Sequence, residues 1–112
     1  MASMRSNGVP VHVGSTGCAS SALTAPPIQE CSNPNRIAVT LPAFNVTTDV
    51  VIFDMDMLLA GSDVTTNTPE TPPGCMSGED DADCIPIFKA LGLPFRGSAP
   101  SEQTVFYSEA MQ

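Results

Sequence analysis

The side chains best suited to binding a soft metal ion are one histidine and three of the six methionines. His12 is the only histidine, and a neutral imidazole is a ligand for copper or zinc. Met76 carries a thioether, which suits Cu(I), and so do Met55 and Met57. A lone histidine is more often structural, and methionine is a common core residue. We take His12 and Met76 as candidate copper ligands.

A second group of candidate ligands is the acidic run over residues 79–83. Carboxylates bind calcium, so Asp80, Asp81 and Asp83 are candidate calcium ligands. The run lacks the alternate ligand spacing, the internal glycine and the terminal glutamate of an EF-hand loop. Carboxylates just before a helix also stabilise its N-terminus, and a helix is expected over residues 85–92. Helix capping is therefore the favoured explanation, with calcium binding as the alternative.

A third pattern is a run of β-forming residues that ends in Asp54-Met55-Asp56. It resembles the opening motif of haloacid-dehalogenase-type phosphatases, where the first aspartate is the nucleophile, the second is the general acid, and magnesium is bound nearby. In that family a glycine follows, whereas Met57 follows here. That fold also needs several βαβ units of about 30 residues each, and only 56 residues follow Asp56. A magnesium-dependent phosphatase is therefore the least favoured function.

The four cysteines permit two disulfides in one of three connectivities. The local pairings Cys18–Cys31 and Cys75–Cys84 are favoured because each closes a short loop dense in turn residues. Each such loop stabilises a fold by roughly 3 kcal/mol in the chain-entropy model. Zinc is less favoured, because structural zinc sites use cysteines separated by about two to four residues, and these pairs are C-x12-C and C-x8-C. Disulfides indicate an oxidising compartment, either periplasmic or extracellular.

Charge and hydropathy exclude several kinds of partner. The chain has 12 acidic and 4 basic residues and a formal net charge of -8. Nucleic acids and anionic membrane surfaces both require clustered Lys and Arg, so neither is expected to bind. No stretch approaches the ~20 apolar residues of a membrane span, and the N-terminus has no signal-peptide pattern. An exported chain without an export signal suggests a mature chain or a fragment.

The elements that must position these residues are read from hydrophobic periodicity and from turn signals. Strands are expected at residues 9–13, 36–41, 49–54 and 105–107, and helices at residues 55–60 and 85–92. Residues 36–41 alternate, with Ile37, Val39 and Leu41 on one face, whereas the continuous apolar run at 49–54 predicts a more buried strand. We expect a single module over residues 11–112 after a flexible leader over residues 1–10.

Four sequence segments together resemble one known family. The segments are HxGSTGC at residues 12–18, CxNPNR at 31–36, PGCMS at 73–77 with Cys84, and Leu91-Gly92-Leu93 before residues 103–106. This combination is similar to the C-terminal half of the metallo-mystery pair four-Cys proteins, which include the periplasmic copper-binding protein of methanobactin operons. The resemblance implies a mainly β, disulfide-stapled sandwich or barrel-like module with long loops and one or two short helices.

The same resemblance implies an exported, non-enzymatic protein that handles copper or binds a partner. The partner implied is a MauG-like dihaem enzyme, which in some members oxidises a tryptophan that then helps to bind copper. These 112 residues contain no tryptophan, so they do not carry that modification. The alternative from the residues is a structural module that completes its sheet by strand pairing with other chains, for instance as a homo-oligomer.

Overall fold

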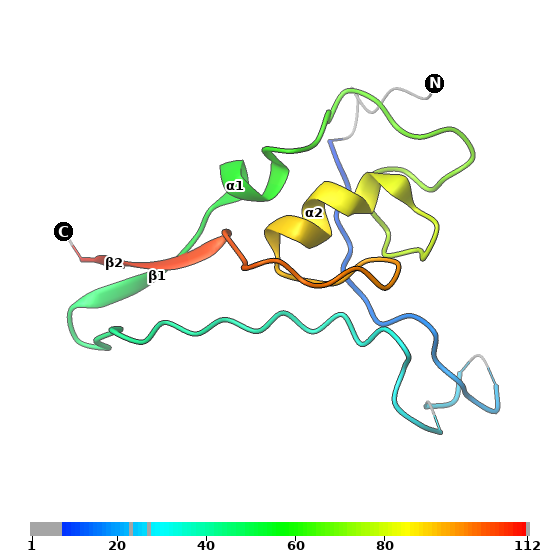
Figure 1. Ribbon diagram of the computed structural model, residues 1–112, viewed down its shortest axis with the longest axis horizontal. Helices are drawn as coiled ribbons and strands as arrows, with labels where there is room; N and C mark the ends of the chain where they lie inside the picture. The colour runs from blue at the N-terminus through cyan, green and yellow to red at the C-terminus, as the bar shows by residue number, and fades with distance from the viewer. Residues whose placement is uncertain (1–7, 23, 27, 112) are drawn as a thin grey trace.

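A computed structural model of the chain describes residues 8–22, 24–26 and 28–111. Regular elements are short and are separated by long loops (Figure 1). In chain order they are β1 (Asp49–Phe53), α1 (Met55–Leu59), the 3-10 turn η1 (Ala82–Cys84), α2 (Ile85–Ala90) and β2 (Phe106–Ala110). Within the described residues, no helix is both long and apolar enough to cross a bilayer. Residues 1–7 of the predicted leader lie outside the described part of the chain.

Strands β1 and β2 pair antiparallel, with Asp49 opposite Ala110 and Phe53 opposite Phe106. The ring centroids of Phe53 and Phe106 lie 5.3 Å apart, so an aromatic contact supports the strand pairing at the end of the sheet next to α1. The strand predicted at residues 49–54 is confirmed, but the expectation that it is more buried is wrong. Val51 is 54% exposed and Phe53 49% exposed, because this sheet has two strands and the described residues place no layer over it.

The helix predicted after β1 is confirmed and starts at a side-chain cap. The Asp54 carboxylate accepts a hydrogen bond from the backbone N–H of Met57 at 3.1 Å, which satisfies one of the free donors of the first turn. The other carboxylate oxygen of Asp54 accepts a hydrogen bond from the Tyr107 hydroxyl at 3.2 Å. Asp54 thus joins α1 to β2, and this role accounts for the aspartate that follows the strand.

The contact with Asp54 gives a prediction for alkaline pH. The hydrogen bond to Asp54, together with burial and the negative charges of Asp54 and Glu109, raises the pKa of Tyr107 above its ordinary value. The interaction therefore stabilises the fold at any pH below the pKa that Tyr107 has in the unfolded chain. This stabilisation is lost as the pH rises through the higher pKa that Tyr107 has in the folded chain. Tyr107 is the only tyrosine and there is no tryptophan, so ultraviolet absorbance reports this phenol alone. We expect Asp54→Asn, which keeps a side chain that can cap α1, to lower the pKa of Tyr107 toward its ordinary value. An unchanged titration of Tyr107 would contradict the role of Asp54 in raising that pKa.

The hydrophobic core lies around α2. Ile87, Phe88 and Leu91 are buried, and Leu58 of α1 packs in the same cluster. Pro86 occupies the first turn of α2, where its missing N–H costs nothing. The helix ends before Gly92, whose φ of +73° suits glycine, and a Cβ there would lie 3.0 Å from the backbone oxygen of Ser101. The helix predicted at residues 85–92 is therefore confirmed, two residues shorter than expected.

Disulfides join Cys18 to Cys31 and Cys75 to Cys84, the two local pairings favoured by spacing. Cys75 and Cys84 are fully buried in the core cluster. Cys18 and Cys31 close a peripheral loop, whose ends also meet through the bridge between Thr16 and Asn33. With two short helices, long loops and a paired sheet, the chain is the small disulfide-stapled β module that the sequence predicts.

Two predicted strands differ from the structure. Residues 36–41 are extended but pair with no described strand, so the predicted strand is wrong as a paired element. The alternation at residues 9–13 gives a single parallel bridge between Val11 and Cys75 rather than a strand. Pro10, at the end of the predicted leader, accepts a hydrogen bond from the backbone N–H of Cys75 at 3.0 Å.

Candidate functional site

Three of the sequence motifs meet around Gly14 and the side chain of Ser77. Its hydroxyl donates a hydrogen bond to the backbone oxygen of His12 and accepts one from the N–H of Gly14 at 2.8 Å. Asn35 donates from Nδ2 to the backbone oxygen of Gly14 at 2.8 Å. Ser77 is 3% exposed, so its side chain lies inside the fold where the first and third motifs meet. The motifs that are far apart in sequence therefore form one structural unit.

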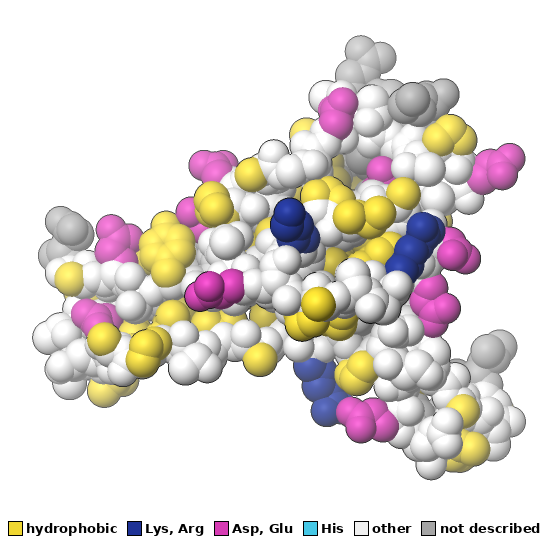
Figure 2. Space-filling model, in the orientation of Figure 1, with side chains coloured by type: hydrophobic (Ala, Val, Ile, Leu, Met, Phe, Trp, Pro, Cys, Tyr) yellow, Lys and Arg dark blue, Asp and Glu magenta, His cyan; other side chains and the backbone are white. Residues whose placement is uncertain are grey.

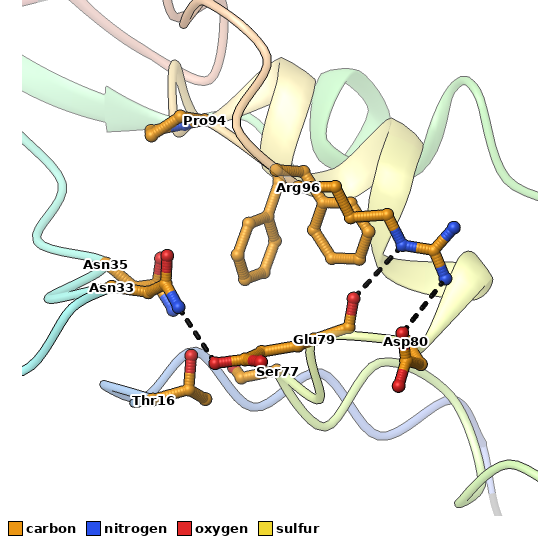
Figure 3. A pocket seen from close by; sticks show the side chains of 10 residues that line it. Thr16, Asn33, Asn35, Ser77, Glu79, Asp80, Pro94 and Arg96 are labelled. Atoms are coloured by element: carbon orange, nitrogen blue, oxygen red, sulfur yellow. Dashed lines mark hydrogen bonds and ion pairs between the residues drawn. The ribbon is translucent and has the colours of Figure 1, made fainter. Parts of the chain in front are cut away.

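This unit forms the floor of an open pocket with a volume of about 470 Å³. Its lining comes from all three motifs and from the loop after α2, and consists of Thr16, Asn33, Asn35, Ser77, Glu79, Asp80, Phe88, Pro94, Phe95 and Arg96. Figure 3 shows the asparagines on one side, the arginine and Asp80 on the other, and the two phenyl rings between them. We refer to these ten residues as the motif pocket.

The motif pocket combines aromatic rings with hydrogen-bonding groups. Phe88 and Phe95 meet edge to face, with ring centroids 5.4 Å apart. Glu79 accepts a hydrogen bond from Asn33 Nδ2 at 3.0 Å, which fixes its carboxylate on the floor. Arg96 lies 5.5 Å from the centre of the Phe95 ring and donates to the Glu79 backbone oxygen. Arg96 thus takes the cation position over the Phe95 ring, and the Glu79 carboxylate gives the floor of the pocket a negative charge.

The candidate copper ligands His12 and Met76 lie beside this unit. Val11 and Cys75 are paired in a parallel bridge and face the core, so their next neighbours, His12 and Met76, occupy adjacent register positions on the opposite side. Neighbouring chains in such a bridge are about 4.8 Å apart. Both residues are exposed, Met76 by 40%. The bridge therefore places His12 and Met76 at adjacent positions of one edge, where the His12 imidazole lies against Gly14.

The candidate calcium ligands have other partners. Asp81, which is 3% exposed, accepts hydrogen bonds from the N–H groups of Asp83 and Met76 and so caps η1. Asp83 accepts hydrogen bonds from the N–H and hydroxyl of Thr68, both at 3.0 Å, and fixes the preceding loop. Asp80 is fully exposed and lies 3.7 Å from Arg96. The three carboxylates therefore contact three different groups and do not converge on one point.

A cluster of three or more His, Cys, Asp or Glu side chains able to hold a metal ion is absent from the described residues. Asp81 and Asp83 direct their carboxylates to the hydrogen bonds that form η1 and fix the loop. The structure thus places these aspartates as capping and loop-fixing groups. A copper site built from one imidazole and one thioether is a different case, because it has two ligands and one of them is a methionine.

Several residues of the motif pocket had no role assigned from the sequence. Asn33, Asn35 and Ser77 belong to the quoted motifs, and Phe95 and Arg96 lie between two of them. Asn35, Ser77 and Arg96 have positive φ angles of 51°, 67° and 52°, which shape the walls of the pocket. Asparagine in a turn is a signal for this conformation, but serine and arginine give none.

The fold and the site define a class: a small, disulfide-stapled β module whose four-cysteine motifs enclose one polar pocket. A comparison with solved structures finds that the chain is similar to MbnP from Methylosinus trichosporium, with 34% sequence identity and a TM-score of 0.79. The match covers 91% of this chain and 38% of that chain, so the chain spans well under half of that protein's length. No model of a protein family and no curated protein sequence matches. The likeness in both sequence and fold supports a relationship to MbnP.

Proposed function

We propose that this chain is an exported, non-enzymatic module of the four-cysteine family that handles copper. The observation that carries the proposal is the likeness to MbnP over 91% of the chain, at 34% sequence identity. The two disulfides fit a periplasmic or extracellular location. A catalytic role has less support, because Asp54 caps α1 and bonds to Tyr107 rather than lying at a catalytic centre.

We place the copper at His12 and Met76. An imidazole nitrogen and a thioether sulfur are both suitable ligands for Cu(I), a soft ion with a low coordination requirement. The Val11–Cys75 bridge sets the two side chains at adjacent positions on the same edge, and the buried disulfide fixes one strand of that bridge. The site needs no modified tryptophan, which these residues lack.

The test is a Cu(I) titration of the purified chain against a chromophoric competitor. We expect one equivalent to bind, and His12→Ala and Met76→Leu each to weaken binding. Losing even an outer partner of a metal ligand costs about 10–100-fold in affinity, so losing a ligand should cost at least about tenfold. Met55→Leu is the matched control, because Met55 is 57% exposed on α1, away from the bridge. Absence of binding at micromolar copper, or equal affinity in all variants, would overturn the proposal.

The dihaem enzyme is the partner that the same resemblance implies, and we propose the motif pocket as its point of contact. The net charge of -8 and the carboxylates of Glu79 and Asp80 in the lining favour a basic surface on such a partner. Co-elution of the chain with a MauG-like dihaem enzyme from the same operon tests this contact. If the pair elutes separately at low salt, copper handling can still hold but this contact does not.

A further inference from the structure

We propose that the sheet of β1 and β2 is the docking site of a strand-forming polypeptide, of the kind that makes up the part of MbnP outside the match with this chain. The inference rests on the relationship to MbnP and is independent of copper binding. It starts from the sheet itself, which has two strands in the described part of the chain. Such a sheet is marginally stable in water until further strands or a second layer complete it.

One face of this sheet is apolar and open to solvent. Val51 and Phe53 lie on it together with Phe106 and Ala110, because residues at alternate positions of paired strands share a face. Val51 is 54% exposed and Phe53 is 49% exposed. Figure 2 shows hydrophobic side chains along the end of the molecule that holds β1 and β2. In stable domains a second layer covers such a face, since its hydrophobic side chains otherwise remain in water.

The outer edge of β1 has backbone groups available for pairing. The Asp54 N–H donates a hydrogen bond to the Val105 C=O at 2.9 Å, so the backbone of Asp54 faces β2. Because hydrogen-bonding positions alternate along an antiparallel ladder, the N–H and C=O groups of Val51 and Phe53 point to the outer edge. Among the described residues, none forms a hydrogen bond with these groups. An edge with free donors and acceptors is a template for an added strand.

The edge of β2 is less suited to an added strand. Gln103 Oε1 accepts a hydrogen bond from the Phe106 N–H, and Gln103 Nε2 donates one to the Phe106 C=O, both at 2.8 Å. The start of this edge is therefore already closed by a side chain. Residues 50–53 of β1 carry no charge, whereas β2 includes Glu109. The added strand thus pairs with β1, and the polypeptide that supplies it covers the face of Val51 and Phe53.

The relationship to MbnP identifies the occupant. The match covers 91% of this chain at a TM-score of 0.79, so MbnP contains a module with this fold. It covers 38% of MbnP, so more than half of that protein lies outside the module and is available to pack against it. The core around α2 needs no further cover, because Ile87 and Phe88 are each 2% exposed. The sheet offers both an apolar face and an open edge, and the contact with the unmatched polypeptide therefore lies there.

The test compares the chain alone with a chimera in which this chain replaces the matched part of MbnP, by hydrogen–deuterium exchange. In the chain alone, the amides of Val51 and Phe53 should exchange as fast as unprotected amides. In the chimera they should exchange at least about a hundredfold more slowly, because strand pairing and burial protect them. MbnP itself is the positive control at the equivalent positions. Amides that exchange equally fast in the chimera, or a chimera that does not fold, overturn the proposal.

Val51→Asp tests the apolar face independently, by thermal unfolding of the chain alone and of the chimera. The chain alone should melt within a few degrees of the wild type, because substitutions at exposed positions have small effects. The chimera should melt roughly 10 °C lower, since an unpaired carboxylate would be buried in the contact. Ile28→Asp makes the same change at a residue that is 74% exposed in the disulfide loop, and should change neither melting temperature. Equally small shifts for Val51→Asp in both proteins, or a large loss in the chain alone, overturn the proposal.

Discussion

Replacing both Cys75 and Cys84 by alanine is expected to lower the free energy of unfolding by about 2–5 kcal/mol, the usual loss for a native disulfide in a small exported domain. Net stabilities of small domains are about 5–15 kcal/mol, so this is a large share. Both sulfurs lie in the core cluster at 0% exposure, against α2 and the bridge to Val11. The loss therefore includes packing as well as loop closure. Thermal unfolding should show a melting temperature lower by roughly 10–20 °C.

The matched control is the replacement of Cys18 and Cys31 by alanine. Its loop is slightly longer, with a sequence separation of 13 against 9, so loop closure alone would make this loss the larger of the two. Cys18 is exposed and Cys31 half-buried, so little packing is lost with them. We expect the control to melt closer to the wild type than the Cys75/Cys84 variant does. The reverse order would show that core packing around Cys75–Cys84 contributes little.

The second large effect is expected for Phe88→Ala. Phe88 is 2% exposed at the centre of α2, and its ring lies at 89° to the ring of Phe95. Removing a buried phenyl ring costs about 3–5 kcal/mol, from lost burial and from the cavity that remains. Urea unfolding should show a lower midpoint with a similar slope. The motif pocket would also lose one of its two rings, so stability and the pocket should change together.

Phe44→Ala is the control for ring removal, since Phe44 is 36% exposed in the loop before β1. We expect a loss below about 1 kcal/mol, the range of surface substitutions without a specific role. Equal losses at Phe44 and Phe88 would place the stabilising core elsewhere than around α2. A small loss at both positions would show that the cluster relaxes to fill the space.

The elements predicted well are those with local signals. Asp54 marks the start of α1 because its short side chain reaches the N–H of Met57. Pro86 and Gly92 mark the start and the end of α2 through their own backbone preferences. Disulfide pairing also follows from spacing, because short loops dense in turns favour local closure. In each case the determining atoms lie within a few residues of each other in the sequence.

The features predicted poorly depend on distant parts of the chain. Residues 36–41 have strand-forming side chains, but pairing requires a neighbour that the sequence of the segment does not specify. The apolar residues of β1 show a preference for extended structure, and they do not show whether a second layer covers it. The motif pocket depends on the positive φ of Ser77 and Arg96 and on hydrogen bonds across more than 60 residues, such as Gly14 to Ser77. Residue type alone does not encode such contacts.

The position of the disulfides has a consequence for covalent connectivity. Cys18–Cys31 lies entirely before residues 36–48, and Cys75–Cys84 lies entirely after them. A single cleavage of the peptide backbone in residues 36–48 would therefore release two fragments that no covalent bond joins. Only non-covalent contacts would then hold the N-terminal third in place, chiefly the Val11–Cys75 bridge and the bonds of Ser77. The contacts that assemble the candidate site thus also determine whether the two fragments of a cleaved chain remain associated.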